Sequence, residues 1–138
     1  MRLLRKKAFT MMEIMTVVTI VGVIAVFAIP NFTKTMETSY EQDGITQLRA
    51  IHAASDIYKA QNGTYWPGDG STYALTDINS NLGLSIMGNG MTYSCTGVAG
   101  GGSYSCTATR ASCTITVTQL ALSTTTPNPS MSAGCVAP

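Results

Sequence analysis

Nineteen residues near the N-terminus, Met11 to Ile29, contain a single charge, the carboxylate of Glu13. Four basic residues precede this run: Arg2, Arg5, Lys6 and Lys7. Counted from Phe9, the 21 residues up to Ile29 would form a helix about 31 Å long, enough to cross the hydrocarbon core of a bilayer. Basic residues before such a run keep that end on the cytoplasmic side. A carboxylate within a spanning helix costs roughly 2.5–3.5 kcal/mol at the bilayer centre, so Glu13 needs a functional explanation.

The helical pattern continues beyond the apolar run. Pro30 is the strongest stop signal between Thr10 and Gln61, and a proline inside a helix predicts a kink. Apolar residues then recur at spacings of three and four, as in an amphipathic helix: Phe32, Met36, Tyr40, Ile45, Leu48, Ile51 and Tyr58. Charged residues surround this stripe, Glu37 and Glu41 among them, and half of the helix is expected to face neighbours or water. Asn62-Gly63 predicts the end of the helix.

A helix of roughly fifty residues is about 75–80 Å long. The rest of a 138-residue chain is too small to bury a rod of this length. The sequence therefore predicts that lipid or other subunits cover its N-terminal half.

Two simple interpretations of the N-terminal run give Glu13 no functional role. A secretory signal peptide cut after Ala28 would have the basic start and apolar middle, but Glu13 falls inside its apolar region. A soluble, secreted binding domain would follow from that interpretation. A plain membrane anchor explains the length of the run, and Glu13 would then reach the headgroups from near the end of the span.

The stretch Lys6-Lys7-Ala8-Phe9-Thr10-Met11-Met12-Glu13 resembles the leader and processing site of type IV pilins and of the related pseudopilins of type II secretion. The resemblance is strong over residues 6 to 32 and weak to about 67. It implies cleavage between Ala8 and Phe9 by a prepilin peptidase and N-methylation of Phe9. Ala8 departs from the glycine that is usual before the cut, and slower cleavage is expected.

The same resemblance assigns Glu13 to an assembly salt bridge with the N-terminal amine of a neighbouring subunit. It implies a homo-oligomeric helical filament, built from an inner-membrane precursor by pilus assembly machinery and extending outside the cell. The filament would serve adhesion, twitching motility or DNA uptake. The alternative is a pseudopilin of a type II secretion system, while the four cysteines and the looped tail favour the pilus.

The last third of the chain predicts an antiparallel sheet. Period-two alternation marks residues 91–95, 104–108 and 113–118, and the glycines between residues 97 and 103 predict a turn between the first two. Cys95 and Cys106 then lie opposite one another within bridging distance. A turn near Arg110 makes Cys106–Cys113 a competitor, and four cysteines allow three pairings.

If Cys95 pairs with Cys106, the second disulfide is Cys113–Cys135. This bond would hold the C-terminal tail and resembles the C-terminal disulfide loop of many pilins. We thus predict an α+β protein with a disulfide-closed C-terminal region: a leader (1–8), a hydrophobic filament-core helix (9–30), its amphipathic continuation (31–62) and a head of loop and sheet (63–138).

Neither catalysis, nor a metal, nor a cofactor, nor nucleic-acid binding is predicted. From Phe9 onward the chain has four basic and seven acidic residues, so no basic face remains for nucleic acid. The lone histidine, His52, is expected to be a hydrogen-bonded structural residue on the helix. Asp69 and Asp77 match no dense calcium loop, and the cysteine spacing is not that of zinc sites, so disulfides outside the cytoplasm are favoured.

Overall fold

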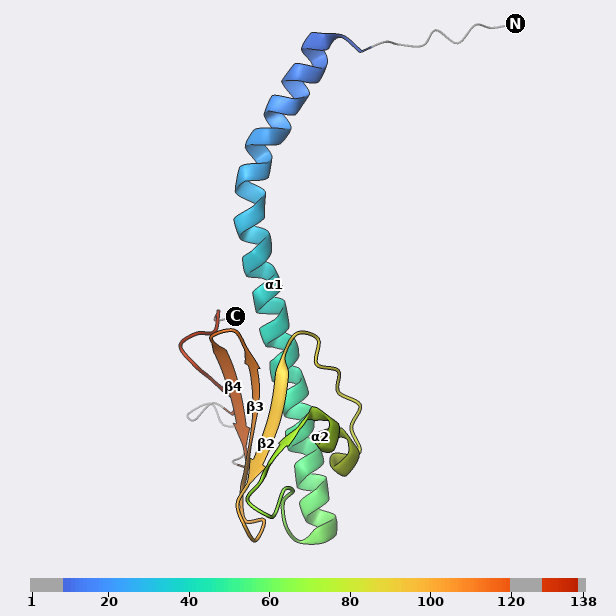
Figure 1. The fold of residues 1–138 in the computed structure, drawn as a ribbon, viewed down its shortest axis with the longest axis vertical. Helices are drawn as coiled ribbons and strands as arrows, with labels where there is room; N and C mark the ends of the chain where they lie inside the picture. Colours follow the sequence, from blue (N-terminus) through green and yellow to red (C-terminus); the bar gives the residue numbers. More distant parts are fainter. Residues whose placement is uncertain (1–8, 120–127, 137–138) are drawn as a thin grey trace, which may run out of the picture. The chain divides into compact units, whose positions relative to one another are not determined.

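A computed structural model describes residues 9–119 and 128–136, without the side chains of residues 28–31. The predicted leader, with Ala8, and residues 120–127 of the tail lie outside this description. The chain forms two compact units, Met1–Met36 and Glu37–Pro138, and each is considered by itself. The elements are α1 (Met11–Asn62), β1 (Thr72–Ala74), α2 (Leu75–Leu82), β2 (Thr92–Gly97), β3 (Tyr104–Arg110), β4 (Cys113–Thr118) and β5 (Ser130–Met131) (Figure 1).

The long helix α1 ends where Asn62-Gly63 predicted. The amide of Gly63 donates to the carbonyl of Lys59 over 2.8 Å, and Gly63 has a φ of 80°. That left-handed conformation is cheap only without a Cβ, which explains a glycine at this helix end. Pro30 lies within α1, and the kink expected there stays a prediction.

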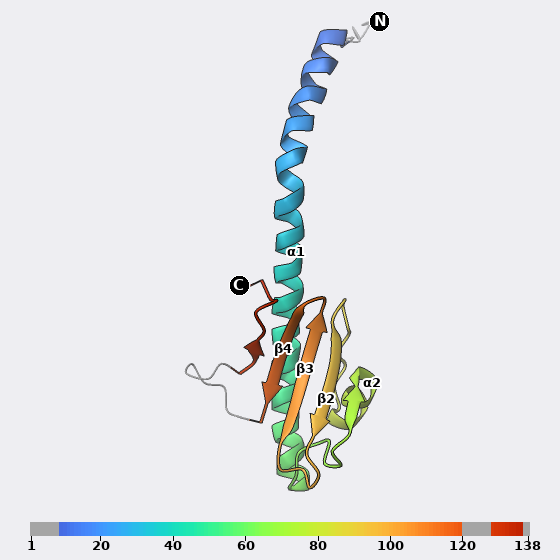
Figure 2. The ribbon, with the colours of Figure 1, turned by 60° about the vertical axis from the view of Figure 1, so that its left-hand side comes forward.

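The five strands form one antiparallel sheet in sequential order, β1-β2-β3-β4-β5. The β2–β3 hairpin places Cys95 directly opposite Cys106, as the repeated alternation predicted. Figure 2 shows β2, β3 and β4 lying along the C-terminal part of α1. The predicted α+β class, a long helix on a small antiparallel sheet, is confirmed.

The core of the head lies between the sheet and the part of α1 within Glu37–Pro138. Leu48 and Ile51 from α1 are fully buried in one cluster with Ile115 and Val117 from β4. Gly44 lies against this cluster: a Cβ there would lie 2.7 Å from the terminal methyl of Met91 and 3.3 Å from that of Ile115, so a larger residue would require the Met91 side chain to shift. The hydrophobic effect of this burial fixes the predicted amphipathic stripe against the sheet.

The other face of the sheet carries hydroxyl side chains. Alternate residues of β3 and β4 are serines and threonines of intermediate exposure. The hydroxyls of Ser94 and Thr107 pair across β2 and β3 at 3.0 Å. This alternation, apolar inside and hydroxyl outside, is the period-two pattern of the sequence expressed in the fold.

The structure adds three short elements within the regions expected as loop and tail: β1, α2 and β5. It also corrects the placement of Glu41, which sequence periodicity put among the charged residues around the apolar stripe. Glu41 is only 4% exposed. Its burial has a specific cause, because the backbone amide of Val136 donates to Glu41 Oε1 over 2.8 Å.

Candidate functional site

The surface of residues 9–27 is formed by exposed apolar side chains. Its large apolar residues are 51% (Ile14) to 80% (Met11) exposed. Phe9, the predicted first residue of the mature chain, is 75% exposed. A contiguous apolar surface of this extent on a soluble monomer marks an interaction site with protein or membrane.

The hydroxyl groups on this surface are turned back onto the helix. Thr16 donates to the carbonyl of Met12, and Thr19 contacts the carbonyls of Met15 at 3.1 Å and Thr16 at 2.9 Å. Backbone carbonyls thus satisfy both hydroxyls locally. With these two hydroxyls satisfied, the carboxylate of Glu13 is the one charged group of residues 9–27.

Glu13 lies in the first turn of α1, where Thr10 caps the helix. The amide of Glu13 donates to Thr10 Oγ1 over 3.2 Å. The spacing Thr10-x-x-Glu13 is that of a capping box, and a carboxylate at a helix N-terminus is favoured by the helix dipole. No ion pair of the Glu13 carboxylate is found among the described residues. Both oxygens of the exposed side chain are therefore accessible to a donor from another molecule.

In the described part of the chain, no single helix is long and apolar enough for a membrane span. The stretches Met11–Phe27 and Phe32–Asn62 meet that requirement only together, as a bent pair and by length and composition alone.

The head closes its C-terminal region with two disulfides. Cys95 is bonded to Cys106 and Cys113 to Cys135. This is the pairing favoured by the sequence, and the competing Cys106–Cys113 bond is not formed. Each bond is expected to contribute roughly 3 kcal/mol, chiefly by restricting the unfolded chain.

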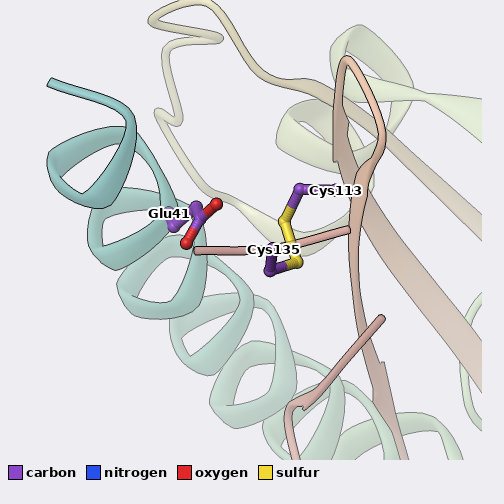
Figure 3. Close-up of side chains that lie close together, drawn as sticks. All are labelled: Glu41, Cys113 and Cys135. Atoms are coloured by element: carbon purple, nitrogen blue, oxygen red, sulfur yellow. A yellow bond between two sulfur atoms is a disulfide. The ribbon is translucent and has the colours of Figure 1, made fainter. Parts of the chain in front are cut away.

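A buried carboxylate accompanies the second disulfide. Figure 3 shows Glu41 of α1 beside Cys113 and Cys135. One carboxylate oxygen of Glu41 and the two sulfur atoms lie within 4.8 Å of one another. While the sulfurs are joined, neither is a thiolate and the trio is not a metal site, because thiolates are the ligands that bind metals. Glu41 instead binds the Val136 amide and so fastens the tail to α1.

Two further polar contacts join α1 to the sheet. The His52 Nδ1 atom lies 2.6 Å from the Tyr104 hydroxyl in the buried interior, the structural hydrogen bond expected for this histidine. Burial raises the pKa of Tyr104. Near Glu37, the guanidinium of Arg110 lies 3.9 Å from the ring centre of Tyr40, a cation–π contact.

The loop acids form internal contacts. Asp69 accepts hydrogen bonds from the Tyr73 hydroxyl and from the Ser71 amide, and both bonds hold the pKa of Asp69 below its ordinary value. Asp77 lies in the first turn of α2. In the described residues these two acids are not part of a cluster of three side chains able to hold a metal.

Sequence reasoning thus located the exposed apolar helix, Glu13 and the cysteine pairs, and missed Glu41. The Thr10-x-x-Glu13 capping signature was present in the sequence and gives Glu13 a local role as well. No local signal marked Glu41, because its partner Val136 is 95 positions away.

Comparison with known proteins gives one informative similarity. The chain is 35% identical over 82 residues to the type II secretion system core protein G of Vibrio cholerae. The matched region is 59% of this chain and 56% of that protein, so the chain spans little more than half of its relative's length. The similarity supports the pilin and pseudopilin family in the broad sense. No protein-family model matches the chain, and no solved structure matches it.

Proposed function

We propose that the protein is a structural subunit of a pilin-like helical filament. The observation that carries this proposal is the apolar surface of residues 9–27, exposed in the single chain and interrupted by one charge. Once the subunit leaves the bilayer, packing this surface against identical helices keeps it out of water, and this burial stabilises the filament. The head, with its hydroxyl-bearing sheet face, would remain in contact with solvent.

Glu13 would set the stagger between neighbouring helices. In an apolar filament core, an unpaired carboxylate costs several kcal/mol, whereas one paired with an ammonium group is tolerated. The partner proposed is the N-terminal amine of Phe9 in a neighbouring subunit. Only one relative shift of the two helices satisfies both charges, so Glu13 would select the alignment while the apolar surface supplies the attraction.

Maturation would create that amine. The leader would be removed between Ala8 and Phe9 by a prepilin peptidase, and Phe9 would then be N-methylated. Before assembly the subunit would reside in the inner membrane through its N-terminal helix, with the basic leader on the cytoplasmic side. Assembly machinery would then transfer subunits into the filament.

Two cellular settings fit such a subunit. A type IV pilus, acting in adhesion, twitching motility or DNA uptake, is favoured by the four cysteines and the disulfide-closed tail. A pseudopilin of a type II secretion system is favoured by the similarity to core protein G. Deleting the gene distinguishes them: loss of surface fibres with normal protein export indicates a pilus, and loss of export indicates the secretion system.

The test of the filament proposal is to determine the N-terminus of the mature protein by mass spectrometry and to image its assemblies by electron microscopy. We expect an N-methylated Phe9 and fibres that contain the protein. A chain that begins at Ile29 would refute the proposal, because the filament-forming helix would have been discarded. A Phe9 start with a strictly monomeric protein in cells that possess the machinery would also refute it.

A further inference from the structure

We propose that Glu41, Cys113 and Cys135 bind one zinc ion in the dithiol form of the protein, before the second disulfide closes. Cysteines enter a chain as thiols, so every molecule passes through this form and no reductant is required. The proposal is independent of filament assembly, because all three residues belong to the compact unit Glu37–Pro138 and none to residues 9–27.

The position of Glu41 is the first observation. One of its carboxylate oxygens lies within 4.8 Å of both sulfur atoms, although the three residues come from α1, β4 and the tail (Figure 3). The side chains already converge from three directions. A modest separation of the sulfurs, once the bond between them is absent, leaves space for an ion among the three ligands.

The unused oxygen of Glu41 is the second observation. Glu41 is 4% exposed, and its Oε2 atom is buried without a hydrogen-bond partner among the described residues. A buried acceptor without a donor costs free energy, more so on a charged group. The Val136 amide satisfies Oε1 only, so the site lacks one electropositive partner. A cation next to Oε2 would supply it.

The ligand chemistry selects zinc. Two thiolates and one carboxylate are ligands that Zn²⁺ accepts, in a tetrahedral arrangement that water completes. Binding is balanced as two thiols plus Zn²⁺ giving two zinc-bound thiolates and two protons. Cys135 is partly exposed, so the ion has a route from solvent. Two groups support the ligands: the Val136 amide on Oε1, and the Ser132 hydroxyl 3.7 Å from the sulfur of Cys135.

Zinc would hold the tail against α1 in the position that the disulfide later makes permanent. An external disulfide oxidant would then close the bond. The step is balanced as two zinc-bound thiolates, one external disulfide and two protons giving the Cys113–Cys135 bond, two external thiols and free Zn²⁺. The ion would therefore protect the thiols from premature reaction and leave when the bond forms.

The test uses the full-length protein in detergent micelles under mild reduction. Cys95 and Cys106 are 0% and 1% exposed, so the more accessible Cys113–Cys135 bond should open first, and peptide mass mapping verifies this. Cobalt(II) is added as a spectroscopic substitute, followed by zinc in competition. We expect one ion per chain with thiolate-to-cobalt absorption in the reduced protein and none in the oxidised protein.

The decisive variant is Glu41→Gln, which keeps an oxygen for the Val136 amide and removes the charge. Its affinity for the ion should fall at least about tenfold, since even supporting groups around a metal site typically contribute 10–100-fold. Asp77→Asn, in the first turn of α2 and outside the trio, is the control and should bind normally. Equal affinity in Glu41→Gln, or no binding by the folded reduced protein, overturns the proposal. Unfolding of the head on opening of the bond, seen by circular dichroism, overturns it as well.

Discussion

Arg110 and Glu37, 73 positions apart in the chain, form a two-pronged ion pair. The Nε atom of Arg110 donates to Glu37 Oε2 over 2.9 Å and its Nη2 atom to Glu37 Oε1 over 3.2 Å. A third donor of the guanidinium, Nη1, reaches the carbonyl of Gly90 at 3.0 Å. One side chain at the end of β3 thus connects α1 with the loop before β2. Paired donors in a fixed planar group make this contact directional.

Glu37→Gln should lower the stability of the head at neutral pH and make stability less dependent on acid. The hydrogen bond from Arg110 holds the pKa of Glu37 below its ordinary 4.5. A carboxyl group whose pKa is lower in the folded protein than in the unfolded chain stabilises the fold at pH values above its unfolded-state pKa. That stabilisation is lost as the pH falls through its folded-state pKa. Thermal melts of wild type and variant should therefore differ at pH 7 and converge well below pH 4.5. A constant difference at all pH values would contradict the ion-pair assignment.

Gly97→Ala should prevent normal folding of the hairpin. A Cβ at this position would lie 1.5 Å from the carbonyl oxygen of Pro67, a backbone atom and not the flexible end of a side chain. The expected loss is at least about 3 kcal/mol of unfolding free energy, at the upper end of overpacking effects. Gly102→Ala is the control in the same hairpin, because nothing lies within 4 Å of its Cβ position. Chemical denaturation of both variants measures the difference, and equal stabilities would argue against the close approach at Gly97.

Tyr93→Phe should leave stability at pH 7 unchanged or slightly higher. The Tyr93 hydroxyl is buried and has no hydrogen-bond partner among the described residues. Its removal eliminates a desolvation cost without breaking a bond. Tyr73→Phe provides the contrast and should be destabilising, since the Tyr73 hydroxyl donates to Asp69.

The same Tyr93 variant should also resist alkali better than the wild type. Burial, with a smaller contribution from Asp43, raises the pKa of Tyr93 from 10.0 to about 12. The unfolded chain ionises first as the pH rises, so this tyrosine reduces the stability of the wild type between pH 10 and about 12. Denaturation curves collected across that range should show a smaller loss for Tyr93→Phe. A parallel decline in both proteins would show that Tyr93 does not govern the transition.

Glu13→Ala should leave membrane insertion and leader removal intact and impair filament assembly. Without its carboxylate the apolar surface remains attractive but no longer distinguishes one stagger from another. Thr19→Val is the matched control within the same surface, since its hydroxyl is already satisfied by backbone carbonyls. Fibre yield, measured by shearing and electron microscopy, should fall for the first variant only. Fibres of normal number and order from Glu13→Ala would remove the pairing role from Glu13.

The sequence predicted those parts of the fold whose signals are local and repeated. The apolar run, followed after Pro30 by a helical period that reaches Asn62-Gly63, predicted α1. Strict alternation around Cys95, Cys106 and Cys113 predicted the central strands. The strands β1 and β5, with three and two residues, are too short to show a period. Helix α2 begins at Leu75, and its N-cap residue, Ala74, makes no side-chain capping hydrogen bond, so the start of this helix carried no signal either.

The buried position of Glu41 could not be read from the sequence. A carboxylate on an amphipathic helix is normally solvated, and periodicity alone placed this one with its charged neighbours. The amide that pairs with the buried carboxylate belongs to Val136, and its neighbour Cys135 is bonded to Cys113. Both contacts arise from tertiary structure. The same is true of Gly97, whose need to be glycine depends on the carbonyl of Pro67.

The inward hydrogen bonds of Thr16 and Thr19 have a consequence for how the proposed filament would grow and shrink. A helix that satisfies its own polar atoms keeps the same bonds whether lipid tails or sister helices surround it. Moving it from one oily environment to the other breaks none of them, and the two environments differ little in apolar character. Apart from the proposed pairing of Glu13, such a step is close to thermodynamic balance. The direction of subunit transfer would then be set by the assembly machinery, and one subunit would serve for both extension and withdrawal of the filament.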